Sequence, residues 1–415
     1  MVLVRLVAAA TLILGTTAVP ASGATAVPSS SAAYVPCPMA ASPTTAPRVP
    51  PVPTGTPRRP TLGGDGLATR GLVVPPGAPA LPTNLTARGW LVADLDTGAV
   101  LGGCGPHQPS PPASVQKLLL AEAVMAKLDP AQPVQITQED LDFEQGSSAV
   151  GLLRGGTYTV DTLWLGLFLN SGNDAANVLA RLGGGADGVP GAIAAMNAEA
   201  RRLGARETHA VTPSGLDGEG QVTSAYDLAL IWRAAFARED FRRYVSTRQA
   251  QIPPQPPKDP KGYQIQNDNQ LLFTYAGALG GKTGFTDAAR HTYVGAAERG
   301  GRRLVVTILG AESQPARGWQ QGAALLDWGF ATPRGATVGH LAEPGEAEKL
   351  AASPTRTPPA AKRPPTTVPA GYRWWPYAAG AALAVTLLVL VLLLGRARRR
   401  KRRRELVRSA PRRVI

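Results

Sequence analysis

The sequence predicts an α+β domain in which one antiparallel sheet is flanked by helices and joined to a mainly helical subregion. Strand patterns stand at both ends of this domain, because apolar residues alternate around a turn at 96–98 and again around a turn at 299–301. Between these two ends, apolar residues recur at helical spacing. A single sheet would therefore be assembled from segments that are distant in the chain, and the helices would cover its faces.

The predicted elements follow one another in a simple order. A hairpin at residues 90–101 comes first, and a helix is expected from Ser114 to about Met125. The middle of the domain holds the clearest helical patterns, at 159–182, 192–204 and 223–240. The last two strands are expected within 291–311 and the last helix at 318–330.

Both ends of the chain predict export and membrane attachment. Residues 1–24 combine an early arginine, an apolar run and small residues, which is the pattern of a signal peptide. Tyr377 to Leu394 is a stretch of eighteen residues without a charge, with an aromatic cluster on one side and a basic run on the other. We therefore expect a transmembrane helix at 374–395, a cytoplasmic tail at 396–415, and the rest of the chain outside the cell membrane.

The charge of the chain is concentrated in that tail. The formal net charge is +14, and the last twenty residues hold eleven Lys or Arg against one Glu, so about +10 of it lies there. A nucleic-acid partner is therefore not expected, and anionic lipid is the simpler contact for the tail. Two segments rich in proline, an extended arm at 25–80 and a stalk at 336–373, leave 81–335 as the predicted globular domain.

Cysteine and histidine usage predicts a disulfide and no metal site or other cofactor. In an exported chain Cys37 and Cys104 would meet an oxidising compartment, so we expect them to pair, with two unpaired thiols as the alternative. Two cysteines and four scattered histidines show none of the spacings that hold a metal.

The first candidate for chemistry is the stretch Ser114-Val115-Gln116-Lys117, at the start of a predicted helix. Ser114 and Lys117 would share one face of that helix, and the face leads into an apolar stripe. A serine hydroxyl needs a neighbouring base to act as a nucleophile, and burial next to a second cation lowers the pKa of a lysine toward that of a base. Taken alone, the serine could equally be an ordinary N-cap.

Two further short motifs lie in the same domain. Ser171-Gly172-Asn173 separates two helical segments, and Lys282-Thr283-Gly284 precedes a strand. By themselves these are a helix break and a basic turn. An S-x-x-K motif followed by a small polar triplet and a K-T-G motif is, however, the signature of serine β-lactamases and penicillin-binding proteins.

The stretches "GLDGEGQVTSAYDLALI", "NDNQLLF", "GGKTGFTD" and "LLDWGF" make the resemblance closer. Residues 85–330 resemble the low-molecular-weight penicillin-binding proteins, specifically the serine-type D-alanyl-D-alanine carboxypeptidases, and this implies their transpeptidase-like fold. The resemblance implies that Ser114 is the nucleophile, Lys117 the general base and Ser171 the proton shuttle. It also implies a set of substrate-binding residues, namely Asn173, Lys282, Thr283, Gly284, Phe285 and Arg317.

The resemblance also implies more specific roles. Asn173 would orient the substrate backbone. Lys282 would be the cation that supports Ser171 and the substrate carboxylate, and Thr283 would hydrogen-bond that carboxylate. The backbone N–H of Phe285 would join that of Ser114 in an oxyanion hole. Arg317 would help to bind the terminal carboxylate, although a solvated residue at a helix start is the alternative.

The sequence departs from the family pattern directly after the third motif. Arg290 and His291 stand where many relatives have glycine and smaller residues. The substitution could narrow the site or change only the surface of a strand.

The function that this implies is removal of the terminal D-Ala from peptidoglycan stem pentapeptides through a serine acyl-enzyme, with β-lactams as covalent inhibitors. A transpeptidase would share the site. A β-lactamase would need a deacylating glutamate, and Glu199 and Glu207 do not stand in the expected E-x-x-x-N setting. A non-catalytic wall-binding protein would not need the nucleophile and its base.

Overall fold

The computed structural model describes residues 34–40 and 61–352. The predicted signal peptide at 1–24, the membrane helix at 374–395 and the tail at 396–415 lie outside these residues. Within the described part of the chain, no helix is both long and apolar enough to cross a membrane.

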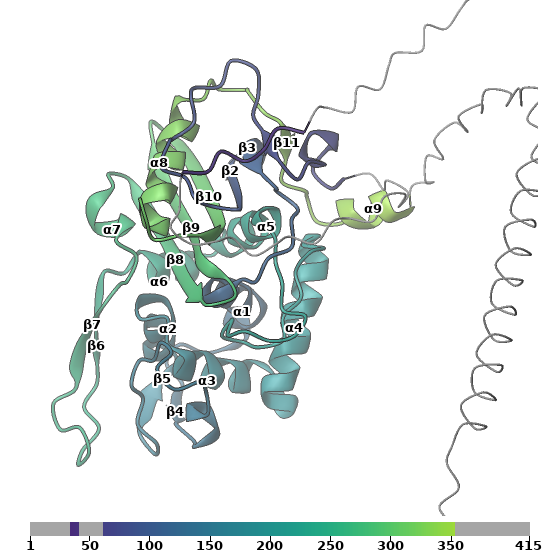
Figure 1. Ribbon diagram of the computed structural model, residues 1–415. Coiled ribbons are helices and arrows are strands. Elements are labelled where there is room, and N and C mark those ends of the chain that lie inside the picture. Colours follow the sequence, from purple (N-terminus) through teal and green to yellow (C-terminus); the bar gives the residue numbers. More distant parts are fainter. Residues whose placement is uncertain (1–33, 41–60, 353–415) are drawn as a thin grey trace, which may run out of the picture. The chain divides into compact units, whose positions relative to one another are not determined.

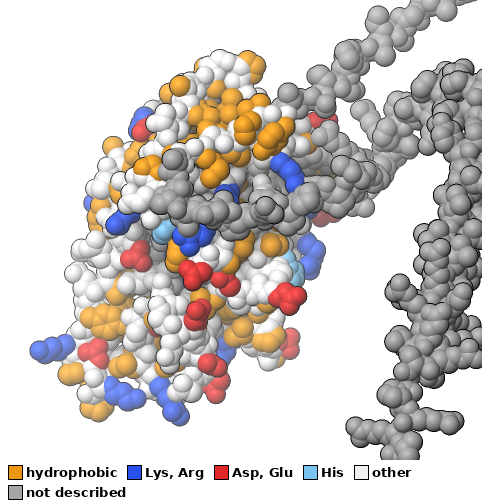
Figure 2. All heavy atoms as spheres, in the orientation of Figure 1, with side chains coloured by type: hydrophobic (Ala, Val, Ile, Leu, Met, Phe, Trp, Pro, Cys, Tyr) orange, Lys and Arg blue, Asp and Glu red, His pale blue; other side chains and the backbone are white. Residues whose placement is uncertain are grey.

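On the face shown in Figure 2, basic side chains are interspersed with acidic ones.

The α+β prediction is confirmed, and a seven-stranded antiparallel sheet organises the domain (Figure 1). Its strands run in the order β1-β3-β2-β10-β9-β8, and β11 also pairs with β3. The strands are β1 (Leu72–Val73), β2 (Gly89–Asp94), β3 (Ala99–Cys104), β8 (Ala278–Thr286), β9 (Arg290–Arg299), β10 (Arg302–Ala311) and β11 (Gly339–His340).

Helices cover both faces of this sheet. The helices are α1 (Lys117–Val124), α2 (Val160–Leu169), α3 (Asn173–Gly183), α4 (Gly188–Leu203), α5 (Ala225–Phe236), α6 (Glu239–Ser246), α7 (Leu271–Thr274), α8 (Gly318–Ala331) and α9 (Glu346–Ala352). Helix α8 packs on β9, β10 and β2, and α5 packs on β10 and β2 (Figure 1). The remaining strands form two small two-stranded sheets, β4 (Pro133–Gln135) with β5 (Thr157–Thr159) and β6 (Gln249–Ile252) with β7 (Tyr263–Gln266).

Strand alternation explains why the sheet is buried on both sides. All six residues of β2 are buried. Leu91 and Ala93 join the larger apolar core with the helical subregion, whereas Trp90 and Val92 join a second core that includes residues of α8. Successive side chains of a strand point to opposite faces, so one short apolar strand contributes to both cores.

The predicted boundaries of the globular domain, 81 and 335, are wrong. Leu62 and Leu67 are buried, and β1 pairs with β3 within the segment predicted to be an extended arm. At the other end, β11 and α9 occupy the beginning of the predicted stalk, and β11 also pairs with β3. Composition predicted these boundaries wrongly, because a Pro-rich segment can dock on the edge of a strand with only a few apolar side chains and its backbone hydrogen bonds.

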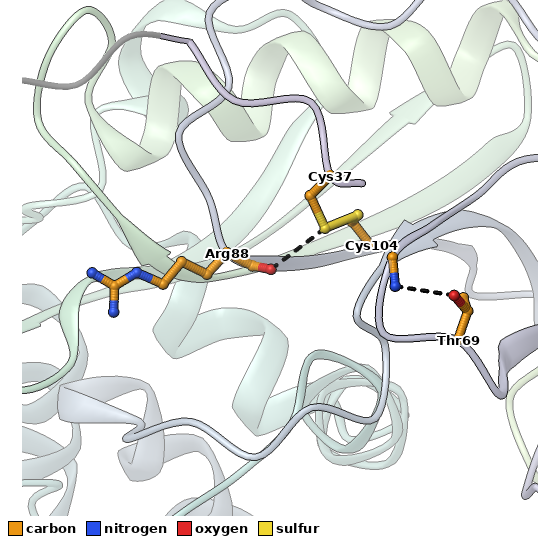
Figure 3. The surroundings of a disulfide bond; sticks show 5 residues. Cys37, Thr69, Arg88 and Cys104 are labelled. Atoms are coloured by element: carbon orange, nitrogen blue, oxygen red, sulfur yellow. Dashed lines mark hydrogen bonds between the residues drawn. A yellow bond between two sulfur atoms is a disulfide. The ribbon is translucent and has the colours of Figure 1, made fainter. Parts of the chain in front are cut away.

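A disulfide attaches the earliest described segment to the sheet. Cys37 and Cys104 are bonded, with their Cα atoms 5.7 Å apart, and Cys104 is the last residue of β3 (Figure 3). Backbone hydrogen bonds support the attachment: Leu72 N–H donates to the carbonyl oxygen of Val35 and Ala40 N–H to that of Leu85. The predicted pairing of the two cysteines is therefore present in the structure.

Candidate active site

The nucleophile candidate lies on a tight turn before α1. Ser114 belongs to a 3-10 turn, Ala113–Gln116, and Ala113 has a positive φ of 49°. Two glycines let other segments approach this turn closely. A Cβ on Gly215 would lie 1.9 Å from the carbonyl oxygen of Ala113, and one on Gly284 would lie 2.8 Å from the backbone nitrogen of Ser114. The sequence therefore brings β8 and the 214–216 loop against the nucleophile by leaving out side chains.

Lys117, the first residue of α1, is completely buried beside Ser114. Its Nζ lies 2.8 Å from Oγ of Ser114, and it donates to Oδ1 of Asn173 at 2.8 Å and to the carbonyl oxygen of Ser214 at 2.7 Å. Burial and the positive charge of Lys282 lower the pKa of Lys117 well below its usual range, against an opposing effect of Asp174.

This geometry suits a neutral amine. A carbonyl oxygen and an amide oxygen can only accept, so they take the two N–H groups that a neutral Nζ retains. The lone pair of Nζ then faces the hydroxyl of Ser114. The arrangement can remove a proton from that hydroxyl, which is what a serine nucleophile requires.

Asn173 connects Lys117 to the opposite wall of the site. Its Oδ1 accepts from Lys117, and its Nδ2 donates to Oγ of Ser147 at 2.9 Å. The neighbouring Asp174 accepts hydrogen bonds from the backbone N–H groups of residues 150, 151 and 152, at 2.9 to 3.0 Å. Residues Asn173 and Asp174 thus fasten the 146–152 loop to the start of α3.

Ser171 and Lys282 form a second serine–lysine pair. Ser171 lies between α2 and α3 with a positive φ of 57° and is buried. Nζ of Lys282, on β8, donates to Oγ of Ser171 and to the carbonyl oxygen of Thr283, both at 2.8 Å. Burial lowers the pKa of Lys282 to about 8, and the charge of Asp268 opposes this effect.

These residues surround one cleft. A cavity of about 330 Å³ is lined by Ser114, Gly146, Ser147, Ser148, Ser171, Asn173, Gly215, Leu216, Asp268, Thr283, Gly284, Phe285, Thr286 and His291. Strand β8 forms one wall and is the last strand of the sheet. The structure thus brings together all the predicted site residues of the three motifs, together with Phe285.

Arg317 is the exception. It is exposed at the N-terminus of α8, where its backbone N–H donates to Oε1 of Gln320 at 2.9 Å, and it does not line the cleft. Sequence reasoning also missed Ser147, Ser214 and Asp268. No motif marks Ser147, and Ser214 acts through its backbone carbonyl, which any residue possesses. Asp268 lies in the quoted stretch "NDNQLLF", the one signal that could have identified it.

A separate polar cluster lies away from the cleft. Among the described residues, the donor atoms of His107, Glu207 and Asp227 lie within 4.8 Å of one another, close enough to hold a cation. Most of their polar atoms are hydrogen-bonded: Nδ1 of His107 lies 3.1 Å from Glu207, its Nε2 lies 3.1 Å from the carbonyl oxygen of Leu62, and Oδ2 of Asp227 accepts from the backbone of Glu207, whereas Oδ1 of Asp227 is buried without a partner among the described residues. Burial and Glu207 raise the pKa of Asp227. The cluster is thus a network that fastens the 61–67 segment to the domain.

Comparison with known proteins gives a consistent picture. A family model described as D-alanyl-D-alanine carboxypeptidase matches residues 76–313. The carboxypeptidase DacB2 of Mycobacterium tuberculosis is 45% identical over 274 residues, which cover 65% of this chain and 90% of that protein. DacD of Salmonella typhimurium is 34% identical over 265 residues, covering 60% and 65%.

Solved structures agree with the fold. The crystal structure of a D-alanyl-D-alanine carboxypeptidase from M. tuberculosis has a TM-score of 0.60 and 44% identity, and it matches over 65% of this chain and all of that one. The DD-transpeptidase of Streptomyces K15 has a TM-score of 0.58 and 29% identity, over 61% of this chain and all of that one.

Proposed function

Because the chain belongs to the serine-type D-alanyl-D-alanine carboxypeptidase family, we propose that it removes the terminal D-Ala from peptidoglycan stem pentapeptides through an acyl-enzyme on Ser114. The observation that carries the proposal is the contact between Nζ of Lys117 and Oγ of Ser114, in a setting that favours the neutral amine. A proposed catalytic serine thus has its base in place before substrate arrives.

The geometry supports the following acylation step. Oγ of Ser114 attacks the carbonyl carbon of the terminal D-Ala–D-Ala bond while its proton passes to Nζ of Lys117. The carbonyl oxygen becomes negatively charged and accepts hydrogen bonds from the backbone N–H groups of Ser114 and Phe285. The C–N bond then breaks: the hydroxyl of Ser171 passes its proton to the departing nitrogen of D-Ala and takes up the proton that Lys117 had received, so that Lys117 is neutral again. Lys282 donates to that hydroxyl and stabilises negative charge near it.

Deacylation repeats the chemistry with water. A water molecule attacks the ester carbonyl while its proton passes to the neutral Lys117, and the ester C–O bond breaks as that proton returns to Oγ of Ser114. A β-lactam would acylate Ser114 by the same attack. Its leaving group stays tethered to the acyl group after the ring opens, which would hinder the approach of water and leave an adduct that clears slowly.

Export and anchoring are part of the proposal. The signal-peptide pattern and the uncharged stretch before the basic tail support an enzyme held at the outer face of the cell membrane, where its substrate is built. Fractionation of cells producing the full chain or a chain ending at residue 373 tests this: only the longer chain should remain with the membranes. Retention of both, or release of both, would contradict the anchor.

The activity test uses the purified full-length chain with a fluorescent penicillin and, separately, an acyl-D-Ala-D-Ala pentapeptide. Ser114→Ala and Lys117→Ala should lose both the adduct and D-Ala release. The exposed residues Ser246 and Lys127 provide matched controls, since Ser246→Ala and Lys127→Ala should retain both. Adduct on wild type without release of D-Ala would favour a transpeptidase, the activity named for the Streptomyces relative. Rapid clearance of the adduct would favour a β-lactamase, and a folded wild type without any adduct would favour a binding protein.

A further inference from the structure

His291 lies in the wall of the cleft, at the start of β9. It pairs with Phe285 of β8 in the antiparallel register, and the two rings are 4.7 Å apart at an interplanar angle of 42°. Because side chains alternate along a strand, Thr283 and Phe285 share one face of β8, and the cross-strand partner His291 shares that face with them. The imidazole therefore stands on the same face as Thr283, one of the residues expected to bind the substrate carboxylate.

The ring of His291 is available to a ligand. It is half-buried, and neither of its nitrogens makes a hydrogen bond with another described residue. The other histidines are engaged: His107 with Glu207, His209 with the carbonyl oxygen of Gly220, and His340 with Glu346. A partly desolvated polar ring that faces a cleft without a protein partner is suited to bind something that enters the cleft.

The surroundings of this ring favour a negatively charged ligand. Arg290 precedes it on β9. Arg317 is the N-cap of α8, and the first residue of that helix, Gly318, lies against the Cβ of His291. Glu312, after β10, offsets part of this charge because it pairs with Arg290 at 3.0 Å. Burial and Arg290 lower the pKa of His291, Glu312 opposes them, and Arg317 lowers it further. The ring is thus a neutral donor in a positively charged corner that includes a helix N-terminus.

We infer that His291 is a substrate-recognition residue, whose N–H donates a hydrogen bond to the C-terminal carboxylate of the peptide that is cleaved. The inference rests on the proposed function, and it assigns a residue that distinguishes a free chain end from an extended or blocked one. Arg317 does not line the cleft, and its charge adds to the positive surroundings of His291. The ring contact with Phe285 would hold the imidazole in position.

The test compares two substrates that differ only at their end: an acyl-D-Ala-D-Ala peptide with a free carboxylate and the same peptide as its terminal amide. A hydrogen bond to a charged group contributes enough that its loss should lower kcat/KM for the free acid by about tenfold to a hundredfold in His291→Ala. In the same variant, kcat/KM for the amide substrate should change by less than about twofold, because that substrate lacks the terminal charge. His291→Asn, which keeps a neutral donor, should recover part of the selectivity. His340→Ala, at an exposed histidine outside the cleft, is the matched control.

The outcomes separate this inference from the proposed function. A selective loss on the free acid, with partial recovery in His291→Asn and none of the loss in His340→Ala, supports the role. If kcat/KM falls equally for the acid and the amide, His291 has a structural role and the inference is overturned. The inference is also overturned if kcat/KM falls for neither substrate. Urea unfolding reports whether the variants remain folded. A wild type that cleaves the D-Ala–D-Ala bond of neither substrate would overturn the proposed function and this inference with it.

Discussion

Replacing Lys282 by methionine should abolish the proposed activity and yet relieve a cost to the fold. The amine of Lys282 is completely buried, and no carboxylate among the described residues forms an ion pair with it. Its two close partners are the hydroxyl of Ser171 and the carbonyl of Thr283. Burying a cation with only neutral partners disfavours the charged form, and this lowers its pKa to about 8.

The magnitude follows from the linkage between protonation and folding. The ordinary pKa of 10.5 and the native value of about 8 differ by 2.5 pH units, which at about 1.4 kcal/mol per unit is about 3 kcal/mol. Between these two values the unfolded chain binds the proton and the native chain does not, so wild-type stability rises with pH in this window. Below pH 8 both states hold the proton and the cost is fully present. A methionine at 282 has no such dependence.

Urea unfolding of the full-length wild type and Lys282→Met, measured from pH 7 to pH 9.5, tests this reasoning. The wild type should gain about 2 kcal/mol relative to the variant between pH 8 and pH 9.5. The loss of two hydrogen bonds in the variant adds a constant offset and leaves the slope unchanged. Lys127→Met, at an exposed lysine, should follow the wild type at every pH. A difference between wild type and Lys282→Met that stays constant across this range would refute the argument.

Three further outcomes are expected. Replacing Cys37 and Cys104 by alanine should lower the free energy of unfolding by up to about 4 kcal/mol, since the bond spans 67 residues of sequence; an unchanged urea midpoint would contradict this. Gly284→Ala places a Cβ 2.8 Å from the nucleophile's backbone nitrogen and should slow penicillin acylation by about tenfold or more, measured by stopped-flow labelling; an unaltered rate would show that β8 can shift freely. Asp268→Asn removes the charge that raises the pKa of Lys282, so the high-pH limb of kcat/KM should move to lower pH, and a limb that does not move would exclude this coupling.

The motif residues could be predicted from sequence because each motif contains the reacting groups themselves. Ser114 and Lys117 stand three residues apart, so their proximity is a local property of a helical turn. The contact of Lys282 with Ser171 is not local, since 111 residues separate them, and only the resemblance to a family predicted it. The partners that act through backbone atoms, such as the carbonyl of Ser214, have no signature in the sequence at all.

The boundaries failed for a different physical reason. Composition predicts whether a segment can bury a core of its own, and the 61–80 segment cannot. It does not predict whether the segment can dock on a core that already exists. Leu62 and Leu67 do this with two apolar side chains, and β1 does it with backbone hydrogen bonds to β3.

The two edges of the sheet differ in whether another strand pairs with them, and this difference bears on function. The outer edge of β3 is covered by β1 at one end and β11 at the other, whereas no strand in the described part of the chain pairs with the outer edge of β8. A free strand edge offers backbone donors and acceptors to any extended peptide. Covering one edge and leaving the other open beside Ser114 directs such a peptide to the cleft. A shortened chain that begins at residue 81 would expose the end of the β3 edge that β1 covers, and it should associate with itself even where its active site remains intact.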